Sequence, residues 1–172
     1  MDRIPSYLVL FAVSVLFQIF LFNNLFISVY MSPLVYITFL VLLPIETPAV
    51  VLLLAGLLMG VVMDWTMGIA GLNTAVALFS AFSRRAVLNL SCGKESVREG
   101  GIPSEQRLRG GVFLRYVIFF VVLNHATFFL LEALSFAQFG AVLLRLLISS
   151  VVTVVFIVLA SRLFVSKRLL RE

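Results

Sequence analysis

The residues of this chain that could do chemistry are few, and the informative ones lie within or at the edges of apolar segments. Asp64, His125, Glu132 and Arg145 are each flanked by runs of Leu, Val, Ile and Phe. Ionisable groups inside a membrane commonly mark an ion path, a ligand site or a buried ion pair. A single histidine supplies neither a nucleophile–base–orienter set nor a metal cage. We therefore expect no enzyme, no metal and no cofactor.

These residues can form a small polar cluster within the membrane. His125 and Glu132 share one face of a predicted helix, because seven residues rotate a helix to within about 20° of the starting direction. Asn124 is adjacent to that face. A lone arginine deep in an apolar helix costs about 2.5–3.5 kcal/mol, so we expect Arg145 to pair with Glu132 or with Asp64. A structural ion pair and a proton or ion path both remain open.

A second pattern consists of small residues and an aspartate at helical spacing. Gly56, Gly60 and Asp64 are four residues apart, so they form one stripe on a helix. Small residues at this spacing let a second membrane helix approach closely. Gly68 and Gly71 then permit a tight turn into the next helix. Asp64 either caps that helix within the chain or binds a partner or an ion.

The composition places all of these residues in a membrane protein. The chain has 172 residues, of which 62% are hydrophobic and 12% charged, and its mean hydropathy is +1.17. A soluble domain is nearer half apolar and a quarter charged. We predict an all-α integral membrane protein in contact with lipid. The net charge of +5 does not indicate nucleic-acid binding, because the basic residues lie at the ends of apolar runs.

Six apolar segments are candidates for transmembrane helices, and two of them are short: residues 7–22, 33–43, 48–63, 71–83, 112–134 and 139–164. With six spans and both termini in the cytoplasm, every basic residue except Arg145 lies on the inner side, as the positive-inside rule requires. Four spans give the same asymmetry and five move only Arg3, so charge does not decide the number. We expect six, because a short apolar run left in water would be an unusual exposed patch.

One polar stretch interrupts the apolar segments. Residues 89–111 contain half of the chain's ten glycines together with mixed charges, and we predict an inner polar loop there. The whole chain, residues 1–172, is then a single polytopic membrane domain. Cys92 lies in this loop, where a free thiol without function is the simplest interpretation.

The residue pattern resembles a known family. Pro33 opens a short second segment, Pro44 follows it, and Gly60-x-x-x-Asp64-x-x-x-Gly68-x-x-Gly71 leads into a fourth helix. This arrangement is similar to the rod shape-determining membrane protein family MreD. The resemblance implies a non-enzymatic subunit of the bacterial elongation machinery, located in the cytoplasmic membrane, with a fold resembling the substrate-binding subunits of energy-coupling-factor transporters. It also implies binding to an MreC-like bitopic scaffold protein and, through it, links to an MreB-like filament, a RodA-like glycosyltransferase and its transpeptidase.

Two sites for such a scaffold follow, together with a second function. Either the Gly56–Gly60 stripe or the helix predicted at residues 112–134 would receive the scaffold's transmembrane segment by close packing. The alternative is a ligand-binding subunit of a small-molecule transporter. Its pocket would need the polar groups of the outer half to converge: Asp64, Asn124, His125 and Glu132.

Overall fold

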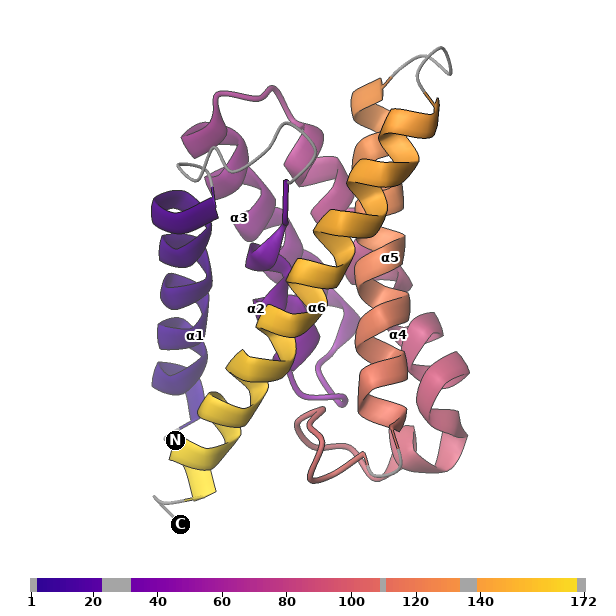
Figure 1. Ribbon diagram of the computed structural model, residues 1–172. Coiled ribbons are helices and arrows are strands. Elements are labelled where there is room, and N and C mark those ends of the chain that lie inside the picture. Colours follow the sequence, from indigo (N-terminus) through magenta and orange to yellow (C-terminus); the bar gives the residue numbers. More distant parts are fainter. Residues whose placement is uncertain (1–2, 23–31, 109–110, 134–138, 170–172) are drawn as a thin grey trace.

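A computed structural model describes residues 3–22, 32–108, 111–133 and 139–169, and every element within these ranges is helical (Figure 1). The all-α prediction is therefore confirmed for the described part of the chain. The elements are α1 (Arg3–Phe17) with a π-helical end, η1 (Gln18–Phe22), the short pair η2 (Val35–Ile37) and α2 (Thr38–Leu42), then α3 (Ala49–Met67), α4 (Leu72–Arg98), α5 (Val112–Ala133) and α6 (Phe139–Leu169).

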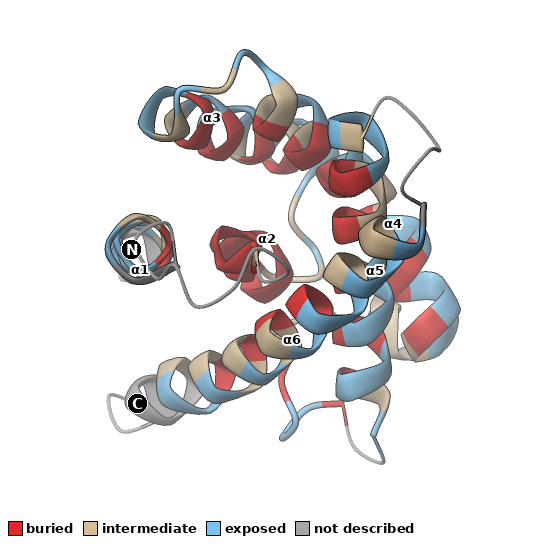
Figure 2. Ribbon diagram, turned by 45° about the horizontal axis from the view of Figure 1, so that its top comes forward, coloured by how far each residue is buried: buried red, intermediate tan, exposed pale blue. Residues whose placement is uncertain are grey.

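The short helix α2 lies at the centre of the molecule, with the long helices around it (Figure 2). Every residue from 33 to 43 is buried. With its preceding turn, η2, the helix is only about 13 Å long, which is less than half the thickness of a hydrocarbon core. The predicted second segment therefore exists as a half-length helix enclosed by protein, because α1, α3, α4, α5 and α6 shield it on its different sides.

In the described part of the chain, three helices are long and apolar enough to cross a membrane: Ala49–Met67, Val112–Ala133 and Gly140–Phe164. A shorter apolar helix covers Ser6–Phe20. Large apolar side chains are exposed along all of these helices, including Val50, Leu54 and Leu58 on α3. Such continuous apolar surface is unusual for a protein in water and is typical of contact with lipid or with another membrane helix.

The start of α1 and the end of α6 lie at one end of the bundle, and the turn between α3 and α4 lies at the other. We call the end where α1 begins and α6 ends the basal end, and the opposite end, with the turn between α3 and α4, the distal end (Figure 1). The described segment that follows α4 lies at the basal end.

The predicted polar loop at residues 89–111 begins too early, because α4 continues to Arg98 with a bend at Gly93 (φ 77°, ψ 159°). The helix persists because Ser91 remains buried against the bundle. Arg115 donates a hydrogen bond to the Ser91 carbonyl (Nε–O 3.1 Å) beside the bend. The segment after α4 is pinned at Gly101, whose N–H donates to the Glu46 carboxylate at 2.6 Å. Residues 109–110 of the predicted loop lie outside the described residues.

Candidate functional site

The glycine stripe is the contact surface between α3 and α4. A Cβ atom added at Gly60 would overlap the Cα of Thr74 and stand 2.9 Å from its amide nitrogen. A Cβ at Gly56 would stand 3.0 Å from both the carbonyl oxygen of Ala77 and the Cβ of Ala81. The two backbones therefore approach as closely as small residues allow, which is the packing the spacing predicts.

Asp64 caps α4 from the end of this stripe. Its carboxylate accepts hydrogen bonds from the backbone N–H of Asn73 (2.8 Å) and of Thr74 (2.9 Å), and from the Thr74 hydroxyl (2.5 Å). These N–H groups belong to the first turn of α4 and have no acceptor within the helix. A negative charge at this position also interacts favourably with the helix dipole.

The turn between these helices has the predicted glycine geometry. Gly68 (φ 66°) ends α3 and Gly71 (φ 80°) precedes α4, both in the left-handed region that disfavours residues with a Cβ. The chain thus reverses direction in four residues, and Asp64 is brought back onto the start of α4.

These contacts correct the prediction that the Gly56–Gly60 stripe receives a partner helix. Helix α4 of the same chain already covers it, and Asp64 is only 9% exposed. A second helix cannot approach a surface that another backbone occupies. Of the two roles considered for Asp64, the structure supports capping within the chain.

Arg145 pairs with Glu132, one of its two predicted partners, at 3.3 Å (Nη1–Oε2) near the distal end. Its Nη2 donates to the Ser32 hydroxyl at 3.3 Å, and its guanidinium lies over the ring of Phe129, 5.0 Å from the centroid. The described hydrogen bonds of Asp64 go to α4, so Asp64 is not the partner of Arg145.

His125 is fully buried and faces α2 and α6. Its Nδ1 lies 3.0 Å from the carbonyl oxygen of Val121, which can only accept, so the proton is on Nδ1. Its Nε2 then accepts from the backbone N–H of Leu34 (3.4 Å) and from the hydroxyl of Thr153 (3.3 Å).

The predicted polar cluster therefore does not form one site. Asn124 donates to the hydroxyl of Ser80 on α4 (2.8 Å), while its neighbour His125 turns toward α2. Phe129 contacts both the imidazole of His125 and the guanidinium of Arg145, and it lies on the helix between His125 and Glu132. The five predicted residues are divided among four separate contacts, because neighbouring positions on α5 face different helices.

Among the described residues, the most deeply buried charge is one that the charge pattern of the sequence predicted on the inner side. Arg84 is 1% exposed and lies at the carbonyl end of α2. It donates to the backbone carbonyls of Val41 (3.3 Å), Leu43 and Pro44 (3.2 Å), and its Nε donates to the hydroxyl of Tyr116 (3.1 Å). The Tyr116 hydroxyl in turn donates to the Val41 carbonyl at 3.3 Å. A planar guanidinium suits this role because it offers five donors in fixed directions.

The opposite end of α2 is held by Gln18, from the π-helical end of α1. Its Oε1 accepts from the N–H of Val35 (2.7 Å) and of Tyr36 (3.3 Å), and its Nε2 donates to the carbonyl of Pro33 (3.1 Å). Together with His125, it satisfies the N–H groups that begin the short helix. A buried helix end without such partners would be strongly destabilising.

Two sequence signals could have identified these residues. Ala77, Ala81, Arg84, Leu88 and Ser91 are three or four apart and all buried, so the pattern of one helical face continues through the arginine. Gln18 is an isolated amide within an apolar run, and such a group requires internal partners.

This arrangement fixes a short helix at the centre of the bundle, and its contacts hold the surrounding helices to that helix. Within the described residues, no group of three His, Cys, Asp or Glu side chains could hold a metal ion. The chain matches no family model, no curated protein and no solved structure.

Proposed function

We propose that this chain is a non-enzymatic membrane subunit of the bacterial cell-elongation machinery, and that it binds a bitopic scaffold protein by transmembrane helix packing. The observation that carries the proposal is the division between interior and surface. The buried side chains of Gln18, Arg84 and His125 hydrogen-bond within the chain, whereas the long helices present apolar side chains outward. Such a surface suits helix packing in lipid, where van der Waals contact supplies the affinity. The resemblance of the Gly60–Gly71 pattern to the MreD family supplies the cellular role.

In the proposed membrane placement, all six helical segments lie at bilayer depth and the basal end faces the cytoplasm. Arg107 lies in the segment after α4, Arg115 near the start of α5 and Arg162 near the end of α6, all toward the basal end, which agrees with the positive-inside rule. The half-length α2 enclosed by longer helices is compatible with a fold like that of the substrate-binding subunits of energy-coupling-factor transporters. Irregular or short helices at membrane depth are tolerated where protein encloses them.

We place the scaffold's helix on α5, the second of the two sites expected from the sequence. Leu114, Ile118 and Val122 are four residues apart and exposed, so they form one apolar stripe along this helix, with Phe119 beside it. The ligand-binding alternative receives less support. Its pocket requires Asp64, Asn124, His125 and Glu132 to converge, and their contacts lie in different parts of the bundle.

The test is co-purification from native membranes in mild detergent, with mass spectrometry of the proteins recovered. The wild type is compared with a variant carrying Leu114→Ala, Ile118→Ala and Val122→Ala. A matched control carries Val50→Ala, Leu54→Ala and Leu58→Ala on the exposed face of α3. We expect a bitopic scaffold protein and wall synthases with the wild type and the control, and loss of both with the α5 variant.

Other outcomes decide against parts of the proposal. Equal recovery of the scaffold with both variants would reject α5 as its site. Recovery of a pair of ATPases with a coupling membrane subunit, in place of a scaffold, would make the chain a transporter subunit.

A further inference from the structure

Charged side chains mark two levels along α5 and α6. Near the distal end, Glu132 of α5 pairs with Arg145 of α6. Near the basal end, Arg115 lies in the first turn of α5 and Arg162 in the last part of α6, and both are exposed. Arg115 and Glu132 are seventeen residues apart, as are Arg145 and Arg162. With a rise of 1.5 Å per residue, each helix therefore places about 25 Å between the two levels.

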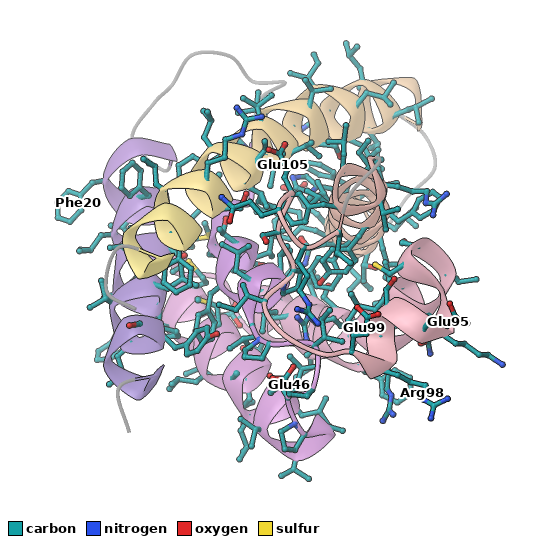
Figure 3. All side chains as sticks on the ribbon, turned by 90° about the horizontal axis from the view of Figure 1, so that it is seen from below. Phe20, Glu46, Glu95, Arg98, Glu99 and Glu105 are labelled. Atoms are coloured by element: carbon teal, nitrogen blue, oxygen red, sulfur yellow. The ribbon has the colours of Figure 1, made fainter. Side chains whose placement is uncertain are left out.

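Partners within the chain hold these four side chains at their levels. Arg145 is held by its ion pair, and Arg115 donates to the Ser91 carbonyl (Nε–O 3.1 Å). Arg162 donates two hydrogen bonds to the Glu105 carboxylate, at 2.9 and 3.2 Å. Figure 3, which views the basal end, shows Glu105 beside α6. Long charged side chains near helix ends otherwise extend toward the headgroups and lengthen the span of a short helix. Here the charges define two fixed polar boundaries.

Between the boundaries, the outward side chains of α6 are apolar. Four of them are spaced at four residues and are each more than half exposed: Leu147, Val151, Val155 and Leu159. Leu143 and Leu163 continue this stripe for less than a turn beyond the boundaries. However, α6 runs obliquely to α5 (Figure 1), so it spans less depth than its length. The apolar thickness at α6 is therefore no greater than at α5.

Helix α3 gives the same dimension independently. Its exposed apolar stripe begins at Val50, just after the exposed Pro48, and continues to Val61. Trp65, which is 87% exposed, follows at the distal end. Tryptophan is enriched where the membrane meets water. Pro48 and Trp65 are seventeen residues apart, which is again about 25 Å.

We propose that the chain binds preferentially to a thin bilayer, with a hydrocarbon core of about 25 Å, and thins a thicker bilayer around itself. We call the outward apolar surface of α3, α5 and α6 between these boundaries the apolar belt. A typical hydrocarbon core is about 30 Å thick, so the belt is about 5 Å too short for it. Short spans are matched by thinner lipid, by extension of flanking side chains or by association of copies. The contacts of Arg115, Arg145 and Arg162 oppose the second of these. The inference rests on the membrane placement proposed above and is independent of the scaffold partner.

The experiment reconstitutes the purified full chain into phosphatidylcholine bilayers whose monounsaturated acyl chains range from fourteen to twenty carbons. The first readout is the melting temperature in each bilayer. The second uses Trp65, the single tryptophan of the chain. In mixtures of a fourteen-carbon lipid with a brominated eighteen-carbon lipid, quenching of its fluorescence reports which lipid is enriched at the protein surface.

A pair of matched variants tests whether the boundaries set the thickness. Glu132→Leu with Arg145→Leu removes the distal boundary from α5 and α6 and lengthens the belt. The control, Lys94→Leu with Glu95→Leu, makes the same exchange at two exposed positions beyond the bend at Gly93, outside the belt.

We expect the melting temperature of the wild type to be highest at fourteen or sixteen carbons and to fall toward twenty. The fourteen-carbon lipid should be enriched about twofold around Trp65. The Glu132→Leu, Arg145→Leu variant should have its optimum in a thicker bilayer, and the control should keep the wild-type optimum.

A wild-type optimum at eighteen carbons or more, no dependence on chain length, or an equal shift in the control would overturn the proposal. Self-association in thick bilayers without enrichment of the short lipid would also overturn it, because copies of the chain would then cover the belt. If the double leucine variant does not fold, the lipid enrichment around Trp65 in the wild type decides. Failure of scaffold co-purification changes none of these readouts.

Discussion

The two ends of the buried helix α2 are held by different chemistry. At its carbonyl end, the cationic guanidinium of Arg84 and the hydroxyl of Tyr116 donate to backbone oxygens. At its amide end, the neutral side chains of Gln18 and His125 accept from backbone N–H groups. Each end therefore has partners of the polarity that its free backbone groups require.

The difference lies in the charge. A cation is favourable at the carbonyl end of a helix dipole, and Arg84 brings one into a position that is 1% exposed. The described partners of its guanidinium are neutral oxygens, with no carboxylate among them. The described side-chain partners at the amide end of α2, Gln18 and His125, are neutral. We infer that the carbonyl end of α2 depends more strongly on a single side chain than its amide end does.

The strongest test of this asymmetry is Arg84→Met. The substitution preserves much of the apolar stem but leaves the carbonyls of Leu43 and Pro44 without the donor described for them, while Val41 keeps only Tyr116, so we expect a loss of about 3–5 kcal/mol in the free energy of unfolding. Arg84→Lys retains the positive charge but lacks the planar set of N–H donors of the guanidinium, so it should recover only part of that loss. Thermal unfolding in mild detergent measures both. A lysine variant as stable as the wild type would show that charge alone holds this end.

The second test concerns the α3–α4 contact that carries both Asp64 and Arg84. Gly60→Ala places a Cβ against the Thr74 backbone, which cannot move without separating the two helices, so we expect a loss of about 1–3 kcal/mol. Gly140→Ala is the matched control, since a Cβ there meets nothing within 4 Å. If the two variants lose equal stability, the close approach of α3 and α4 is not the cause.

The distal end provides the third test. Gln18→Met removes the acceptor for the N–H groups of Val35 and Tyr36 while keeping a similar length, and we expect a loss of about 1–3 kcal/mol. His125 and the backbone of η2 remain in place. A loss larger than that of Arg84→Met would reverse the proposed asymmetry between the two ends.

A smaller effect is expected at the Glu132–Arg145 pair. The side chain of Glu132 is 39% exposed and that of Arg145 is 26% exposed, so solvent or headgroups weaken their attraction. Glu132→Gln should therefore cost less than about 1 kcal/mol. The melting temperature, measured beside that of Arg84→Met, gives the comparison. A loss similar to that of Arg84→Met would mean that the distal pair is as important as the basal cap.

The smallest expected effect is on the rate at which the Cys92 thiol is alkylated. The Cys92 side chain is partly buried against the bundle. An alkylating reagent reaches it less readily than a free thiol, so alkylation should be slower than that of glutathione. Alkylation kinetics, with glutathione as reference, measure this effect.

Much of the candidate site could be predicted from local spacing. The stripe of Gly56, Gly60 and Asp64 and the turn at Gly68 and Gly71 follow from helical periodicity. The cost of a lone charge limited the partners of Arg145 to Glu132 or Asp64, and the structure decides for Glu132. Each involves residues close in the sequence or a charge with few possible partners. The single polar cluster was predicted wrongly, because Asn124 and His125 are adjacent in sequence yet face different helices.

The sequence by itself determined that the chain is helical, that its helices are apolar, and that α3 and α4 form a tight hairpin. Hydrophobic composition and the spacing of apolar residues are properties of the sequence itself, so they can be determined without knowing the fold. The tertiary structure decided that residues 35–42 form an enclosed half-length helix and that Arg84 caps it from more than 40 positions away. Spatial enclosure converts an apparent surface arginine into a buried cap, because only the folded chain brings the free carbonyls of α2 to that guanidinium.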